Sequence, residues 1–263
     1  MDTKDKVLLG FSIATFFTSV AYAVFGKKIH ARITENKNDR EPLAFTKSLN
    51  AVGSIQTAIP ITKKGFYTST ESAAIKSKLD AIYKANKSII DTCSKLNKIP
   101  VSLINSVIFI ESAGDKNAVN GYAVGLMQIE YTSATDIVTR ERQNKTLTEQ
   151  EKVLIKKYVG EAKFNKIMKA SMGDSFFTKA EVLKPELNIL LGTMYLGQII
   201  KKENVNSTGR LDRMIIRYNL GFYTKKIPSG DVNAVLNSPN VRQVSKDYVL
   251  KLGGKNGTLD LLV

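Results

Sequence analysis

The chain has 263 residues, 43% of them hydrophobic, which is enough for one good-sized domain with an extension or for two small domains. Its formal net charge of +15 would attract nucleic acid, anionic lipid or acidic polysaccharide. The lysines are scattered and form no nucleic-acid-binding motif, so we do not expect nucleic acid as a partner. A single cysteine, Cys93, and a single histidine, His30, exclude an intramolecular disulfide and argue against a metal site, and no cofactor is expected.

The amino-terminal region contains an uncharged run, Val7–Gly26, of a length that spans a bilayer as a helix. We favour an uncleaved membrane anchor, because the run continues past the small-residue sequence "AYA" that ends at Ala23. The alternatives are a signal peptide cleaved after Ala23 and a helix buried in a soluble domain. Residues 1–28 are therefore assigned to an anchor or signal peptide, and residues 29–68 to a polar tether with little structure of its own.

From Ser69 onward the sequence is typical of helices. "STESAAIKSKLDAIYKAN" and "KSIIDTCSKLNK" have apolar residues at helical spacing, and Pro100 ends the second run. The segment 113–128 contains glycines and suits turns or a short β excursion. Residues 140–184 are charged and partly helical, with a capping box at Thr148–Glu151. Further helices are predicted at about 101–112, 185–201, 210–220 and 240–251, with a tail at 256–263.

Glu111 is the first candidate for chemistry. Ile104, Val107, Ile108 and Glu111 recur at i, i+3, i+4 and i+7, so the carboxyl belongs to the apolar face of its helix. Desolvation disfavours a charged carboxylate, which predicts a raised pKa and a proton donor suited to general-acid catalysis. The alternative is an ordinary glutamate at a helix end, exposed to water and capped by Gly114.

Two later stretches carry candidate binding groups. "GLMQ", at Gly125–Gln128, combines a glycine that allows close backbone approach with an amide that can donate and accept hydrogen bonds. In "LDRMIIRYNLG", Tyr218 shares one helix face with apolar residues, Asn219 follows it, and Gly221 is a natural helix stop. Tyr218 either fills the core or finds a polar partner, for which a neighbouring carboxyl would serve.

The order of these blocks is more specific than any one of them. "ES" at the end of an apolar helix, "GLMQ", "NILLGTMYLGQII", "YNLG" and "DYVLKL" occur in this order between about residues 85 and 252. This order resembles the lytic transglycosylase domain, in the lysozyme-like family that includes goose-type lysozymes. The resemblance implies a mainly α, α+β lysozyme-like fold: a single helical catalytic domain at 69–255, with 140–184 as an extended insertion and a small irregular or β excursion after the catalytic helix.

The resemblance also implies an activity. Such enzymes cleave the β-1,4 bond between N-acetylmuramic acid and N-acetylglucosamine in peptidoglycan. Glu111 matches their single catalytic glutamate, which acts first as acid and then as base. The base step activates the C6 hydroxyl of the muramic acid and forms a 1,6-anhydro product. A second catalytic carboxylate, usual in glycosidases, is then dispensable.

Several other positions match the family's substrate-binding residues. Asn120 stands where the family usually has a serine that hydrogen-bonds the glutamate, and Glu130 adds a carboxylate that the family pattern lacks. Glu130 could bind substrate, position a water molecule or simply be exposed. The remaining positions that the resemblance assigns to substrate binding or to the shape of the cleft are Gln128, Tyr218, Asn219, Gly125, Met127 and Tyr195.

The expected setting is a bacterial or phage enzyme that acts on peptidoglycan glycan strands. We expect it to be held in a membrane by residues 7–26 facing the cell wall, or to be secreted if cleaved, or to be associated with a virion or secretion apparatus. Two alternatives remain: a lysozyme-type hydrolase of the same bond, and a catalytically silent wall-binding component of a virion or secretion apparatus.

Overall fold

The computed structural model describes residues 42–46, 58–62, 65–225 and 227–262. The described residues all belong to one compact unit, 42–263, which is separate from residues 1–41. The predicted membrane segment, residues 7–26, lies outside the described residues. Within the described ranges no helix is both long enough and apolar enough to cross a bilayer.

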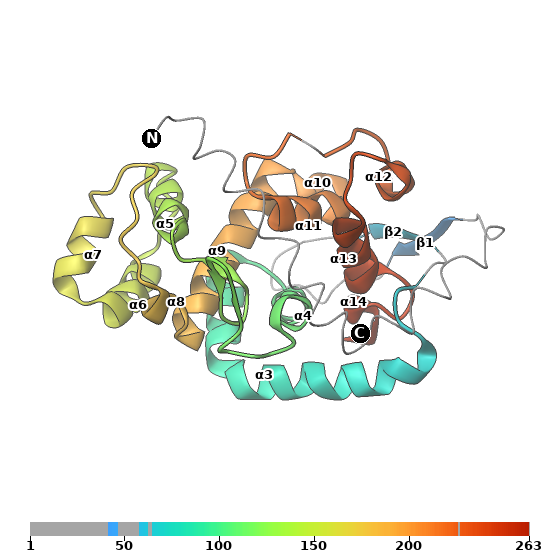
Figure 1. Ribbon diagram of the computed structural model, residues 1–263, viewed down its shortest axis with the longest axis horizontal. Coiled ribbons are helices and arrows are strands. Elements are labelled where there is room, and N and C mark those ends of the chain that lie inside the picture. Colours follow the sequence, from blue (N-terminus) through green and yellow to red (C-terminus); the bar gives the residue numbers. More distant parts are fainter. Residues whose placement is uncertain (1–41, 47–57, 63–64, 226, 263) are drawn as a thin grey trace. The chain divides into compact units, whose positions relative to one another are not determined.

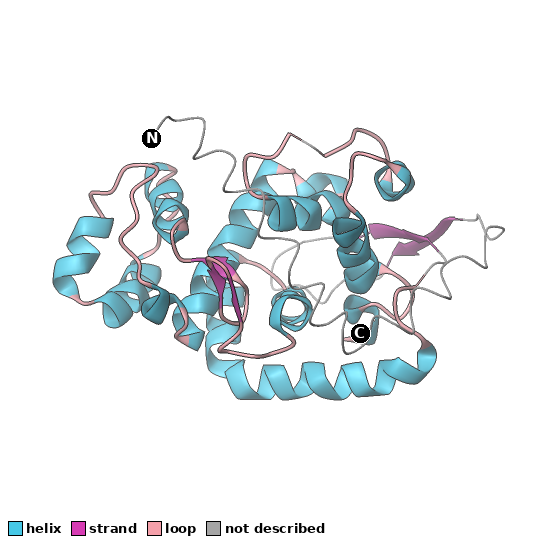
Figure 2. Ribbon diagram, in the orientation of Figure 1, coloured by secondary structure: helices cyan, strands magenta, loops and turns pink. Residues whose placement is uncertain are grey.

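The described part of this unit is mainly helical (Figures 1 and 2). Its helices are α3 (Ser69–Asn97), α4 (Val101–Ser112), α5 (Ala134–Gln143), α6 (Glu149–Val159), α7 (Glu161–Ile167), α8 (Lys179–Val182), α9 (Pro185–Lys202), α10 (Val205–Thr208), α11 (Leu211–Leu220), α12 (Val232–Asn237), α13 (Gln243–Gly253) and α14 (Thr258–Leu261). Two small antiparallel sheets accompany them: β1 (Pro42–Thr46) pairs with β2 (Ala58–Thr62), and β3 (Val119–Asn120), β4 (Ala123–Val124) and β5 (Ile129–Glu130) follow in that order. The predicted fold class, mainly α with a β excursion after the helix that carries Glu111, is confirmed.

Helix α9 forms the centre of the core. It begins with Pro185, whose fixed φ suits the first turn of a helix, and its sequence is apolar on nearly all sides. A helix of that composition is stable in water only when other elements surround it. Accordingly, α9 packs against α3, α5 and α11 and buries most of its side chains.

The helix ends agree with the sequence signals. Thr148 and Glu151 form the predicted capping box: the Thr148 amide donates to the Glu151 carboxylate at 2.8 Å, and the Glu151 amide donates to the Thr148 hydroxyl at 3.2 Å. Gly221 caps the end of α11 with a φ of 94°, a conformation that favours glycine. Cys93 is a free, buried core residue, as its place in a helix predicts.

Elements outside the predicted domain, 69–255, contact it at both ends. The predicted tail contains α14, whose Leu259 is buried in the core, and this short helix packs against α3, α4 and α13. At the other end, strands form within the predicted tether, and Tyr67 joins the domain: its ring lies 6.4 Å from that of Phe109, and its carbonyl accepts from Asn256 Nδ2 at 3.2 Å. Segments this short carry no periodicity, so only tertiary contacts reveal them.

Residues 140–184 run from the end of α5 through α6, α7 and α8 and return to α9 (Figure 1). Two hydrogen bonds attach the loop between α7 and α8 to α5. The Gly173 amide donates to the Asp136 carboxylate at 2.8 Å, and the Phe176 amide donates to the Thr135 hydroxyl at 2.9 Å. The predicted insertion is therefore folded onto the rest of the domain through specific contacts.

Candidate active site

Glu111 lies in the last turn of α4, a helix that packs against α3 and α13 (Figure 1). Ile104, Val107 and Ile108 on the same face are fully buried, and Glu111 itself is only partly exposed. Burial raises the pKa of its carboxyl from 4.5 to about 7, against smaller lowering effects from Tyr248 and Lys251. The environment predicted from the apolar face is therefore present, and near neutral pH a large fraction of this carboxyl keeps its proton.

Helix α13 supplies two neighbours of Glu111 that the sequence reasoning did not single out. Tyr248 is buried, and its hydroxyl influences the Glu111 pKa, yet in the described part of the chain it makes no hydrogen bond of regular geometry. Lys251 follows one turn later, with its ammonium 4.7 Å from the centre of the Phe66 ring, and burial lowers its pKa. The only sequence signal was the family-like "DYVLKL", which marks no role for either side chain.

The "GLMQ" segment is fastened to α4 and α11 by side-chain hydrogen bonds to its backbone. The hydroxyl of Ser112, the residue after Glu111, donates to the Leu126 carbonyl at 2.8 Å. The hydroxyl of Tyr218 donates to the Met127 carbonyl at 2.8 Å. These bonds place "GLMQ" beside the end of α4, and they explain why "ES" and "YNLG" occur together with it.

A third connection comes from α9. Asn188 is fully buried, its Oδ1 accepts from the Met127 amide at 2.7 Å, and its Nδ2 donates to the Val124 carbonyl at 2.8 Å. Gly125, with a φ of 75°, leaves room for this amide, because a Cβ there would lie 2.5 Å from Asn188 Nδ2. Gly192 likewise leaves room for the fully buried Met127 side chain, because a Cβ at Gly192 would lie 2.4 Å from the Met127 sulfur.

Burial changes the meaning of one predicted binding residue. The Met127 side chain, expected to contact substrate, is fully buried in the core and packs against Gly192 of α9. It therefore stabilises the position of the "GLMQ" segment. Gln128 is half-buried with a φ of 47°, and its Nε2 donates to the carbonyls of Gly125 at 2.9 Å and Ala118 at 3.3 Å. The Gln128 amide nitrogen therefore links the chain at Ala118 to the turn at Gly125, while the amide oxygen is the part of this side chain that can accept a hydrogen bond.

Tyr218 lies close to Glu111, but its hydroxyl does not donate a hydrogen bond to the Glu111 carboxyl. Its hydroxyl is committed to Met127, and the charge of Glu111 contributes to its raised pKa after the larger effect of burial. The neighbouring carboxyl expected as its partner is thus near, but the Met127 carbonyl takes the hydrogen. Next to it, Asn219 Oδ1 accepts from the buried Ser245 hydroxyl at 2.7 Å, which ties α11 to α13.

The other predicted residues come from α9, β3 and β5. The Tyr195 ring is 5.2 Å from that of Tyr218, and burial raises the pKa of its hydroxyl. Asn120 is partly exposed in β3, paired with Ala123. Glu130 is exposed and accepts from the Ser133 hydroxyl at 3.3 Å. Its charge helps to raise the pKa of Tyr195, whereas the pKa of Glu111 is set by burial, Tyr248 and Lys251.

Comparison with known proteins agrees with this geometry. Residues 88–180 match the family model of the transglycosylase SLT domain, a stretch that contains α4, the β excursion and Glu111. The match ends before α11 and α13, which supply Tyr218 and Tyr248. No curated protein and no solved structure matched the chain. At the level of the family, this domain supports a lytic-transglycosylase-type activity on peptidoglycan. Residues 88–180 therefore resemble a transglycosylase SLT domain, which supports a lytic-transglycosylase-like family for that part of the chain.

Proposed function

We propose that the protein cleaves the β-1,4 bond between N-acetylmuramic acid and N-acetylglucosamine in peptidoglycan and leaves 1,6-anhydromuramic acid ends. The observation that carries this proposal is Glu111: burial on a rigid helix raises its pKa to about 7, within the segment that matches the SLT domain. A carboxyl with such a pKa donates and then accepts a proton near neutral pH.

In the proposed reaction, the Glu111 carboxyl gives its proton to the glycosidic oxygen. The bond between that oxygen and C1 of the muramic acid breaks, and N-acetylglucosamine leaves with a free hydroxyl. The Glu111 carboxylate then takes the proton of the C6 hydroxyl of the same muramic acid, whose oxygen bonds to C1. The carboxyl ends the cycle protonated, and no water is consumed.

The surroundings of Glu111 favour this use of a single carboxyl. Glycosidases with two catalytic carboxylates hold them across the scissile bond. Among the described residues, the charged group that acts on the Glu111 pKa is the ammonium of Lys251, which lowers it. Tyr218 cannot give its hydrogen to the carboxylate while it bonds to Met127. Burial and the commitment of the Tyr218 hydroxyl to Met127 keep the proton on Glu111 before the reaction, against the smaller lowering effect of Lys251.

The test is mass spectrometry of sacculi digested with the full-length protein. We expect anhydro-muropeptides from the wild type and none from Glu111→Gln. Glu130→Gln is the matched control: it makes the same chemical change at an exposed glutamate nearby and should still release anhydro products if Glu130 holds no water for the reaction.

Two other results would replace the proposal. Reducing-end muramic acid as the only product of the wild type would identify a hydrolase of the same bond. Binding to sacculi without any soluble product would identify a wall-binding component without turnover.

For location, we propose that residues 7–26 anchor the protein in a membrane so that the domain faces the cell wall. The support is the uncharged run of that segment, whose length suits a bilayer. The mass of the native protein checks this: a mature chain that starts at Val24 would contradict the anchor and indicate secretion.

A further inference from the structure

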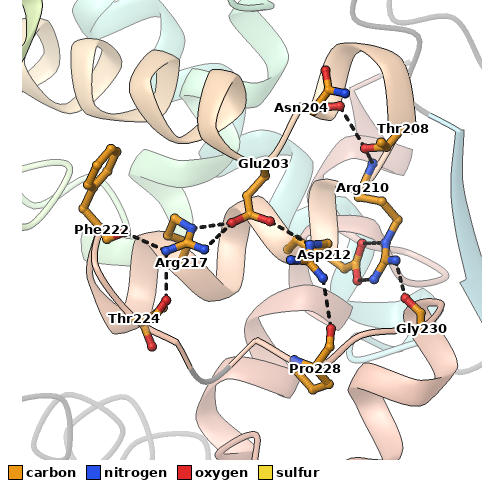
Figure 3. A network of polar contacts seen from close by, with 11 residues as sticks. Glu203, Asn204, Thr208, Arg210, Asp212, Arg217, Phe222, Thr224, Pro228 and Gly230 are labelled. Carbon is orange, nitrogen blue, oxygen red and sulfur yellow. Dashed lines mark hydrogen bonds and ion pairs between the residues drawn. The ribbon is translucent and has the colours of Figure 1, made fainter.

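The loop that follows α11 is held in place by a row of arginines. Arg213 and Arg217 lie one turn apart on one face of α11, and Arg210 is the residue that precedes the first turn of this helix. Their guanidinium groups donate to backbone carbonyls of the loop that leads to α12 (Figure 3). The carbonyls are those of Gly230 for Arg210, Pro228 for Arg213, and Phe222 and Thr224 for Arg217.

A buried carboxylate fixes this row to α9. Glu203, at the end of α9, is 8% exposed and accepts from both Arg213 and Arg217 (Figure 3). Arg217 is itself 7% exposed, so its charge is compensated inside the protein by Glu203 and by the loop carbonyls. Removing one partner would leave a buried charge, so the arrangement keeps the start of the loop in one conformation.

The fixed loop continues a series of aromatic rings that starts beside Glu111. The ring of Tyr218 lies 5.2 Å from that of Tyr195, which lies 6.4 Å from that of Phe222, which lies 5.2 Å from that of Tyr223. Exposure rises along the series, from 8% at Tyr218 to 66% at Tyr223. The series therefore leads from Tyr218, whose pKa is affected by the charge of Glu111, to the surface at Tyr223.

Two cations gather at the outer end of this series. The guanidinium of Arg140 and the ammonium of Lys202 each lie 4.5 Å from the centre of the Phe222 ring, and Lys202 also lies 5.7 Å from that of Tyr223. Arg140 is oriented by Gln198, which accepts from its Nε at 2.7 Å. Neither cation forms an ion pair with an acid in the described part of the chain.

We propose that Arg140, Lys202, Phe222 and Tyr223 form a subsite for a carboxylate of the peptide stem carried by the peptidoglycan strand. This proposal rests on the proposed function. In a peptide-bearing strand the lactyl carboxyl of the muramic acid is consumed in the amide bond to the stem, so the free carboxylates are those of the stem peptides. A guanidinium and an ammonium without acidic partners provide charge-assisted hydrogen bonds for such a group, and the exposed Tyr223 ring offers apolar surface to the rest of the stem.

The test compares two substrates with the full-length protein: glycan strands that bear peptide stems, and the same strands after an amidase has removed the stems. The second kind carries its free carboxylates on the lactyl groups of the sugars, so the pair distinguishes a carboxylate of the stem from one on the glycan. We expect the wild type to prefer peptide-bearing strands, measured as the ratio of kcat/KM. Lys202→Glu should reduce that preference about tenfold, since one such contact is worth roughly 1.5 kcal/mol. Tyr223→Ala should reduce it less, and Tyr223→Phe should retain most of it.

Lys201→Glu is the matched control. It makes the same charge change at the neighbouring exposed position of α9, where no aromatic ring or acid contacts the lysine in the described structure, and it should keep the wild-type preference. An equal loss of preference in both lysine variants would mean general electrostatic attraction and would overturn the subsite. A preference that follows phosphate-containing wall polymers instead of stems would overturn it as well.

A binding experiment separates this proposal from the proposed function. Glu111→Gln is mixed with fluorescent strands of both kinds, and the dissociation constants are measured with and without Lys202→Glu. If the wild type releases no product but Lys202 still determines binding to peptide-bearing strands, the subsite stands and the catalytic proposal fails. If Lys202→Glu binds both strands as the parent does, the subsite fails.

Discussion

The partly buried carboxyl of Glu111 should destabilise the folded protein as the pH rises. A carboxyl whose pKa is higher in the folded state than in the unfolded chain takes up protons on folding. Its contribution to stability is fully present below the unfolded value of 4.5 and is lost as the pH rises through the folded value of about 7. Glu111→Gln removes the charge and with it this loss.

The size of the effect follows from the two pKa values. A rise from 4.5 to about 7 is a difference of about 2.5 pKa units. At 1.36 kcal/mol for each unit, this corresponds to about 3 kcal/mol, an upper value because part of the side chain still contacts water. We therefore expect the free energy of unfolding of Glu111→Gln, relative to wild type, to increase by up to about 3 kcal/mol between pH 4.5 and pH 8.

The assay is chemical denaturation of both proteins at closely spaced pH values, followed by circular dichroism. The informative quantity is the difference between variant and wild type, because other titrating groups cancel in it. Glu130→Gln is the control, since an exposed glutamate relieves no burial when it is replaced. A difference for Glu111→Gln that stays flat across this pH range would refute the idea that desolvation keeps the proton on Glu111.

Three further predictions concern the surroundings of the site. Activity should fall as the pH rises through about 7, and Tyr248→Phe should move this limb to higher pH, because the Tyr248 hydroxyl lowers the Glu111 pKa; a pH profile of kcat checks both. Tyr218→Phe leaves the buried Met127 carbonyl without its donor and should lower the free energy of unfolding by about 1 to 3 kcal/mol, measured by denaturation; an unchanged stability would contradict that hydrogen bond. Gly192→Ala places a Cβ 2.8 Å from that of Met127, so we expect about 1 to 3 kcal/mol of destabilisation and a drop in kcat, and a variant as stable as wild type would show that the packing gives way there.

Much of the architecture follows from local patterns. Helices α4, α9 and α11 lie where apolar residues at helical spacing predicted them, with ends that differ by a residue or so. The capping box at Thr148 and the stop at Gly221 are also local, because each depends on groups within a few residues. The raised pKa of Glu111 follows the same logic, since its helical position already places it on the apolar face.

The partners of the site residues could not be predicted in this way. Tyr218 was expected beside the catalytic carboxyl, but its hydrogen goes to a carbonyl of "GLMQ", 91 residues away in the sequence. Asn188 was not singled out at all, because nothing in an apolar helix signals that one amide will hold the backbone 61 residues earlier. Met127 was expected at the substrate and lies in the core.

The sequence by itself therefore determined the longer helices and the β excursion, because these depend on residues that are neighbours along the chain, and the order of its motifs pointed to Glu111 as the candidate acid. The tertiary structure decided what surrounds that acid: Tyr248 and Lys251 from α13, the fastening of "GLMQ", and the cationic aromatic cluster at Phe222. Desolvation, charge and hydrogen-bond partners come from elements far apart in the sequence, and only their packing brings them within range of one another.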